Sequence, residues 1–299
     1  MKKKIAVFML FGQSNAVGHR ATMAEEDIID TPLANVYGLH RDPNQSFDTD
    51  HLTFSGYTSH GMNLAETQDN TYSVANCLAR LWQDEIDGGN PNGLPDLYIV
   101  HIAIGSQGVY GMWNPDREKV LIPGKLGQVN ISMYPLAVHT LELFRAFMEE
   151  KGLEPEFVGM HWRGGEQETR LHVSELEEKL KDVYLRLLGG LREAMGYPVP
   201  VYMHLMPFKS CMTRIRPTHH SYISMVYINA LFEELCGELE DAHLFDVTRC
   251  PHYNPNVPDY GLLRPDLIHF TGETNQWVAA EIFREFKGKR QNTVDESNT

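Results

Sequence analysis

Short apolar runs that alternate with longer amphipathic segments limit most strongly what this chain can fold into. The runs cover residues 5–11, 97–104, 157–162, 199–205 and 243–247, and each is apolar on successive residues. That pattern is typical of strands covered on both faces of a sheet. The segments between and after them, residues 72–84, 133–151, 173–195, 222–239 and 271–286, carry apolar side chains at helical spacing.

This order of strand, helix and strand predicts right-handed crossovers, a mostly parallel sheet and helices on both of its faces. We therefore expect an α/β fold, a three-layer α/β/α sandwich of flavodoxin-like type with a central parallel sheet of about five strands. We interpret residues 1–287 as one domain. Residues 288–299 are polar and are expected to form a disordered C-terminal tail.

Charge and motif content exclude several classes of partner. The 299 residues include 26 basic and 40 acidic ones, a formal net charge of −14. This argues against nucleic acid or an anionic membrane as the partner, because both require clustered Lys and Arg. No run approaches the roughly 20 apolar residues of a membrane span. The sequence has no P-loop, no GxGxxG and no clustered Cys and His, so nothing in it calls for a cofactor or metal.

The N-terminus and the cysteines bear on the compartment. Three lysines followed by an apolar run resemble the start of a signal peptide, but the run is short and breaks at Gly12. We interpret it as the first strand and expect a cytoplasmic protein. Cys77, Cys211, Cys236 and Cys250 contain no CxxC pair. They fit thiols in a reducing compartment, with a Cys211–Cys250 disulfide as the alternative.

Two stretches, residues 42–71 and 105–131, lack the strand and helix pattern and are longer than ordinary connections. Long loops in compact domains are usually functional or disordered. Because they carry Tyr57, Tyr110 and Trp113, we interpret them as loops that wall a substrate site. Variable surface decoration is the alternative.

A serine directly follows the first predicted strand, in Phe11-Gly12-Gln13-Ser14-Asn15-Ala16-Val17-Gly18-His19. Open α/β folds bind ligands at the carboxyl edge of the sheet, where the strand order reverses. A hydroxyl there is exposed, and backbone N–H groups of the turn can face a developing oxyanion. The segment is not the GxSxG elbow of α/β-hydrolases, since Ala16 takes the place of the last glycine. Alone, a serine in such a glycine-rich turn is more often structural, so a second element is needed.

A candidate base for Ser14 lies near the other end of the chain, in Arg264-Pro265-Asp266-Leu267-Ile268-His269. Serine needs an adjacent base that is itself oriented by a third group. An Asp three residues before a His can accept the imidazole Nδ1–H, which leaves Nε2 to take a proton. His19 could line the same site. His101, inside an apolar strand, is interpreted as a core histidine.

Together these segments resemble the SGNH (GDSL-like) hydrolase superfamily. The Gly-Gln-Ser-Asn form is similar to its sialate O-acetylesterase and acetylxylan-esterase-like branch (carbohydrate esterase family six). Two further blocks occur in the order that the resemblance requires: Ala103-Ile104-Gly105-Ser106-Gln107-Gly108 after the second strand, and His161-Trp162-Arg163-Gly164-Gly165-Glu166-Gln167-Glu168 after the third.

The resemblance implies a role for each matched residue. Ser14 would be the nucleophile and, through its backbone N–H, the first oxyanion donor. Gly105 would give a second N–H, its missing side chain letting the substrate approach closely. His269 would act as base and then as acid, with Asp266 holding it. Gln13 and Asn15 would support the nucleophile.

The third block departs from the pattern. The branch has a Gln whose amide is the third oxyanion donor, and Gly164 stands at that position, while the trailing Asp becomes Glu168. Losing one such donor typically costs about 10²–10³ in rate. Arg163 or Gln167 could supply the contact, and we favour Arg163. Gly165 and Glu166 complete the block, with Glu166 expected to anchor the turn that carries Ser14.

The resemblance implies hydrolysis of a short acyl ester, an O-acetyl group on a small molecule or oligosaccharide. Two rivals stay open. One is a lipase- or thioesterase-like enzyme acting on longer acyl chains. The other is a carbohydrate-binding relative whose chemistry has faded, as the substitution at Gly164 permits.

Overall fold

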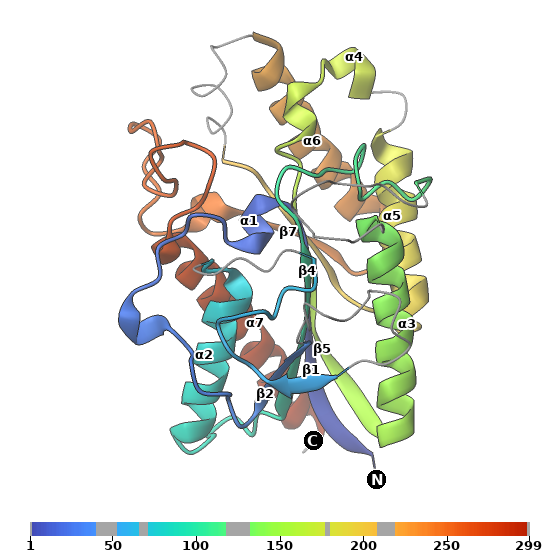
Figure 1. Cartoon of the computed structure of the whole chain (residues 1–299), viewed down its shortest axis with the longest axis vertical. Coiled ribbons are helices and arrows are strands. Elements are labelled where there is room, and N and C mark those ends of the chain that lie inside the picture. The colour runs from blue at the N-terminus through green and yellow to red at the C-terminus, as the bar shows by residue number, and fades with distance from the viewer. Residues whose placement is uncertain are drawn as a thin grey trace.

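A seven-stranded sheet forms the centre of the fold in the computed structural model (Figure 1). The structure describes residues 2–39, 53–65, 71–117, 132–176, 180–207 and 219–297. The strands are β1 Lys3–Gly12, β2 Val36–Leu39, β3 Phe54–Gly56, β4 Asp96–Ala103, β5 Leu153–Arg163, β6 Val201–His204 and β7 Ala242–Phe245. Their order in the sheet is β3-β2-β4-β1-β5-β6-β7.

The five predicted strands are confirmed, and they pair in parallel in the order β4-β1-β5-β6-β7. This is the flavodoxin-like order, in which the chain reverses direction across the sheet beside its first strand. The expected number of strands is wrong by two: β2 pairs in parallel with β4, and β3 pairs antiparallel with β2. These two strands have four and three residues, too short to give a periodic pattern.

Helices cover both faces of this sheet (Figure 1). They are α1 Ser14–Val17, α2 Val74–Asp87, α3 Met133–Lys151, α4 Val173–Leu176, α5 Leu180–Met195, α6 His219–Glu238 and α7 Gly272–Ser297. Strand β1 is buried throughout its centre and alternates between two cores. Val7, Met9 and Phe11 pack with α3, α5 and α6, whereas Phe8 and Leu10 pack with α1, α2 and α7.

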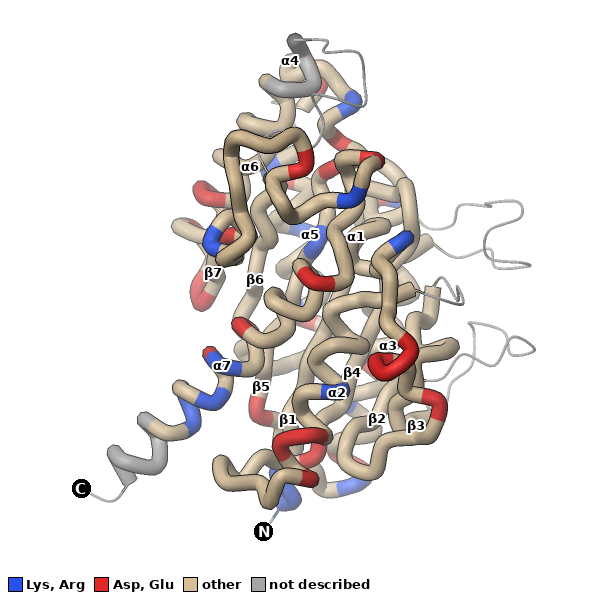
Figure 2. The backbone as a smooth tube through the Cα atoms, turned by 90° about the vertical axis from the view of Figure 1, so that its left-hand side faces the viewer, with Lys and Arg blue, Asp and Glu red and all other residues tan. Residues whose placement is uncertain are grey.

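The helix predictions are confirmed with small changes of bounds. The segment 173–195 is two helices, α4 and α5, with residues 177–179 outside the described part. The prediction of a disordered tail from residue 288 is wrong, because α7 continues to Ser297. Figure 2 shows basic residues on the part of α7 just before this end. The extension is anchored by Lys289 Nζ on Tyr202 Oη at 2.8 Å and by Arg290 on the Gly93 carbonyl at 2.9 Å.

Two of the aromatic side chains expected to wall a site are core residues. Tyr57 and Trp113 are buried, and Trp113 packs edge-on against Trp162. Tyr110 is half-buried. Residues 42–52, 66–70 and 118–131 of these two stretches lie outside the described part of the chain, as does Cys211. Within the described ranges, no helix combines the length and apolarity needed to cross a membrane.

Candidate active site

Ser14 lies where the strand order reverses. Strand β1 ends at Gly12, and Ser14 is the first residue of α1 at the carboxyl edge of the sheet, beside β5. Gly12 has a φ of +139°, and a Cβ there would lie 2.0 Å from the Arg163 carbonyl oxygen. Only glycine therefore lets β1 turn into α1 while staying against β5. Ser14 itself is half-buried.

Helix α1 is a single turn that a side chain of β4 supports. The Ala16 and Val17 N–H groups donate to the Gln13 carbonyl at 2.9 and 3.0 Å, whereas the N–H groups of Ser14 and Asn15, at the start of the turn, have no acceptor within the helix. His101 of β4 supports the other end, with Nε2 at 2.9 Å from the Ala16 carbonyl oxygen. Burial lowers the pKa of His101 to about 4, against the opposing effect of that carbonyl. His101 is thus a buried, neutral support, as the sequence predicts.

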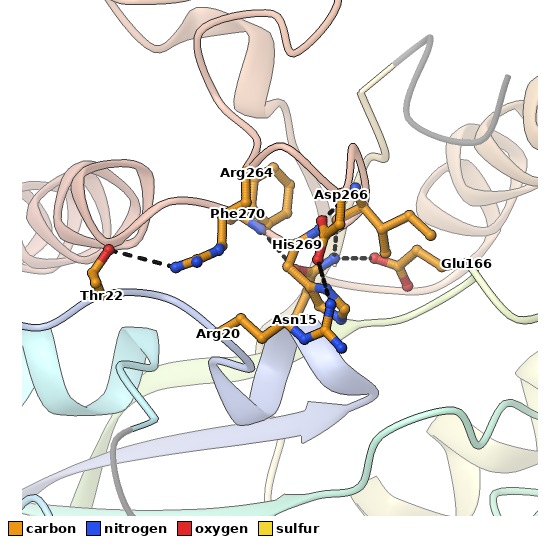
Figure 3. Close-up of polar contacts among 9 residues, drawn as sticks. Asn15, Arg20, Thr22, Glu166, Arg264, Asp266, His269 and Phe270 are labelled. Atoms are coloured by element: carbon orange, nitrogen blue, oxygen red, sulfur yellow. Dashed lines mark hydrogen bonds and ion pairs between the residues drawn. The ribbon is translucent and has the colours of Figure 1, made fainter. Parts of the chain in front are cut away.

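Asp266 and His269 form a hydrogen-bonded pair in the loop before α7 (Figure 3). His269 Nδ1 lies 2.7 Å from Asp266 Oδ2. Asp266 Oδ1 accepts the backbone N–H groups of Ile268 and His269 at 3.1 and 3.0 Å. Leu267 between them has a φ of +58°, a left-handed conformation that turns the loop back on itself. The carboxylate thereby fixes the loop and the imidazole together.

The environment of the pair sets the charge of both groups. Burial alone would raise the pKa of Asp266, but hydrogen bonds from the backbone and ring of His269 hold it well below its usual value. For His269, burial lowers the pKa below 6.5, and the Asp266 carboxylate opposes that effect. The pair thus consists of an ionised carboxylate and an imidazole that is neutral at pH 7, the forms that a general base requires.

Asn15 joins the Ser14 turn to the His269 loop. Its Nδ2 donates to the Ile268 carbonyl at 3.1 Å, and its Oδ1 accepts the Phe270 N–H at 3.1 Å. The same Nδ2 donates to Glu166 Oε1 at 2.7 Å. Asn15 therefore holds the residues on both sides of His269 next to Ser14 and ties both segments to the third block. Figure 3 shows these contacts converging on Asn15.

Gln13, on the other side of Ser14, is fixed in the same way. Its Nε2 donates to Glu168 Oε2 at 3.0 Å, and its Oε1 accepts the Gln167 N–H at 3.1 Å. Glu168 is buried and also accepts the Val109 N–H at 2.7 Å. Burial raises the pKa of Glu168, while these hydrogen bonds oppose the rise. Glu168 thus links the Ser14 turn, the segment after β4 and the third block.

Arg163 lies beneath the site rather than in it. It is 2% exposed, and its guanidinium Nη1 donates to the Asn15 carbonyl at 3.0 Å and to Asn275 Oδ1 at 2.9 Å. The guanidinium carbon lies 4.8 Å from the centre of the Phe270 ring. Burial lowers the pKa of Arg163 to about 10, and the Glu166 carboxylate opposes this. Arg163 therefore supports α1 and the His269 loop, which removes the reason for favouring it as an oxyanion donor.

Gly105 lies in the turn after β4, and the space beside it is filled. A Cβ on Gly105 would lie 2.6 Å from His19 Cε1 and 3.3 Å from both ring nitrogens. The glycine thus makes room for the His19 imidazole, and the close approach of substrate to Gly105 stays a prediction. The same imidazole lies 5.8 Å from the His269 ring, centre to centre. His19 accordingly touches both halves of the candidate site.

Several supporting residues have no signal in the sequence. Asn63 brackets the end of β4, since its side chain accepts from the Ala103 N–H and donates to the Ala103 carbonyl, both at 2.9 Å. Asn275 links Arg163 to the Tyr72 carbonyl at 2.8 Å. Each of these two asparagines joins segments far apart in the chain, so no local sequence pattern predicts its role. Gly164 and Gly165 continue β5 into the third block, and Gly165 has a φ of +120°.

The described part of the chain contains no group of three His, Cys, Asp or Glu side chains that could hold a metal ion. The titratable side chains around the Ser14 turn are the Asp266–His269 pair, His19 and the Glu166 and Glu168 carboxylates of the third block.

Comparison with known proteins establishes the fold. No protein-family profile and no curated protein sequence matches this chain. Among solved structures, the crystal structure of NanS matches with a TM-score of 0.60 at 14% identity and covers 98% of both chains. A carbohydrate acetylesterase from Xanthomonas citri matches with a TM-score of 0.53 at 12% identity, covering 92% of this chain and 54% of that one. The chain has the α/β fold of these proteins, the fold that the resemblance to SGNH hydrolases implies.

Proposed function

We propose that this chain is a serine esterase that removes short acyl groups, O-acetyl in particular, from a carbohydrate. The observation that carries the proposal is the Asp266–His269 pair, which Asn15 ties to the turn bearing Ser14. A hydroxyl, an imidazole in its neutral form and an orienting carboxylate are the three groups that acyl transfer through serine requires.

In the proposed reaction, Ser14 Oγ attacks the acyl carbonyl carbon while His269 Nε2 takes the hydroxyl proton. The backbone N–H groups of Ser14 and Gly105 stabilise the oxyanion of the tetrahedral intermediate. Collapse of this intermediate breaks the ester bond, the sugar alkoxide takes the proton from His269, and an acyl-enzyme remains. Water then attacks the acyl-enzyme, gives a proton to His269, and releases the acid and free Ser14.

The preference for a short acyl group rests on His19. Its imidazole fills the space beside Gly105 and approaches the His269 ring, so the volume next to the proposed oxyanion donor is already occupied. A long acyl chain would have to displace this ring. The choice of an acetylated sugar is supported by the fold shared with a carbohydrate acetylesterase.

The experiment is hydrolysis of p-nitrophenyl acetate by the wild type, Ser14→Ala and Ser174→Ala. This ester is reactive enough to report a weak oxyanion site. We expect turnover by the wild type, a loss of at least about 10³-fold in Ser14→Ala, and no change in Ser174→Ala, which removes an exposed hydroxyl on α4. Equal rates for wild type and Ser14→Ala would refute Ser14 as the nucleophile.

The same assay distinguishes the proposed esterase from a carbohydrate-binding relative that has lost catalytic activity. A carbohydrate-binding relative would hydrolyse the ester at the background rate in both proteins, and Ser14→Ala would leave its affinity for a sugar unchanged. The neutral imidazole beside an ionised carboxylate favours the esterase, because binding alone does not need that pair.

A further inference from the structure

Arg20 reaches the Asp266 carboxylate from a different part of the chain. It follows α1 in a turn whose Gly18 and Arg20 both have positive φ, +80° and +57°. Its guanidinium Nη1 lies 3.3 Å from Asp266 Oδ2, the oxygen that also accepts His269 Nδ1 (Figure 3). A left-handed conformation is costly for a residue with a side chain, and here it directs the side chain toward the base-orienting carboxylate.

This contact completes the surroundings of the carboxylate. Oδ1 accepts two backbone N–H groups of its own loop, while Oδ2 is shared between the imidazole and Arg20. The Asp266 side chain is 16% exposed and the Arg20 side chain 62%. The cation thus approaches from the solvent side, and the imidazole from the protein side.

We propose that Arg20 is a positioning residue of this site, which shares the Asp266 carboxylate with His269 and so keeps the imidazole in its neutral, basic form at lower pH. The inference rests on the proposed esterase function for its role in catalysis. A cation on Oδ2 offsets part of the negative charge that would otherwise stabilise the imidazolium. Removing that cation should therefore make His269 easier to protonate.

The other charged groups around His269 act in both directions. Asp266 in its own loop and Glu166 after β5 favour the imidazolium, whereas burial and the His19 ring after α1 oppose it. The buried Arg163 guanidinium lies behind Phe270 and adds a further positive charge nearby. Among the arginines that the structure describes, Arg20 is the one whose contact with the orienting carboxylate is on the solvent side, so its effect should depend on salt.

Arg264 provides a matched control. It belongs to the same loop as Asp266, but its guanidinium contacts Thr22 Oγ1 at 3.5 Å rather than a carboxylate (Figure 3). Arg264→Gln also removes one positive charge near the site, but it leaves the contacts of Asp266 unchanged. Arg20→Gly removes the Arg20 charge and also relieves the left-handed backbone, so it remains informative if Arg20→Gln folds poorly.

The test is a pH titration of the His269 ring nitrogens by NMR, with His269→Gln used for assignment. At low ionic strength we expect Arg20→Gln and Arg20→Gly to raise the His269 pKa by about 0.2 to 0.7 unit, the range that exposed ion pairs allow. Arg20→Lys should retain most of the wild-type value, Arg264→Gln should not change it, and high salt should move the wild type toward Arg20→Gln. The acid limb of kcat/KM should move by the same amount.

An unchanged His269 pKa in both Arg20→Gln and Arg20→Gly would overturn the proposal, as would an equal shift in Arg264→Gln. Because the titration needs no turnover, it is separable from the proposed function. An inactive wild type in which Arg20→Gln still shifts the pKa would refute the esterase and leave the inference about Arg20 standing.

Discussion

At the scale of single residues, the site depends on side chains that hold the candidate catalytic groups. Gln13 and Asn15 flank Ser14 and bind the third block 155 and 151 residues away. Asn15 also holds the backbone on both sides of His269. Each amide has its oxygen and nitrogen occupied, so a shortened side chain at either position would leave buried polar groups without partners.

His19 gives a prediction at this scale. Because its ring fills the space beside Gly105, His19→Ala should open that space and admit longer acyl chains. We expect the ratio of kcat/KM for p-nitrophenyl butyrate to that for the acetate to rise about tenfold, the effect of a change of one or two methylene groups in pocket size. His172→Ala, which truncates an exposed histidine beside α4, is the control. An unchanged ratio in His19→Ala would argue that another side chain limits acyl length.

The residues predicted from the sequence are those with local signals. Asp266 and His269 are three positions apart, and the predicted contact between them is present. The contact between Arg20 and Asp266 spans 246 positions, and no spacing rule can predict it. Arg163 illustrates the same limit: its charge suggested a donor to substrate, but its burial depends on Asn275 and Phe270, whose positions only the fold determines.

At the scale of elements, the strands with continuous apolar runs and the long helices were predictable, since burial on both faces leaves a clear pattern. Strands β2 and β3 were not, because their few residues carry no periodicity and their pairing depends on β4. The last turns of α7 were missed for a related reason. Their sequence is polar and has no apolar periodicity, and the contacts of Lys289 and Arg290 there are with residues far away in the chain.

The junction of β1 and α1 gives a prediction at the scale of elements. Gly12→Ala would place a methyl group 2.0 Å from the Arg163 carbonyl oxygen at a φ of +139°, so it should destabilise the protein by at least about 2 kcal/mol. Gly189→Ala in α5 is the matched control, because its Cβ would meet nothing within 4 Å and alanine should stabilise the helix by about 0.5–1 kcal/mol. Urea unfolding measures both. A change within about 0.5 kcal/mol for Gly12→Ala would contradict this account of the junction.

At the scale of the whole molecule, the order of the strands determines where chemistry can occur. Strand β1 lies between β4 and β5, so the segments after all three strands meet at one edge of the sheet. The Ser14 turn, the Gly105 turn and the third block follow those strands, and the loop before α7 closes over them. The site is thus a property of the topology, and its residues come from four regions spread over the chain.

The central claim is that Ser14 is a nucleophile activated by His269. The most direct measurement is the mass of the intact protein after reaction with a p-nitrophenyl phosphonate ester, followed by peptide mapping. We predict a single covalent adduct on Ser14, absent from Ser14→Ala and formed at least about 10³-fold more slowly by His269→Gln at pH 7. An adduct on a different residue, or none on a wild type that hydrolyses p-nitrophenyl acetate, would contradict the claim.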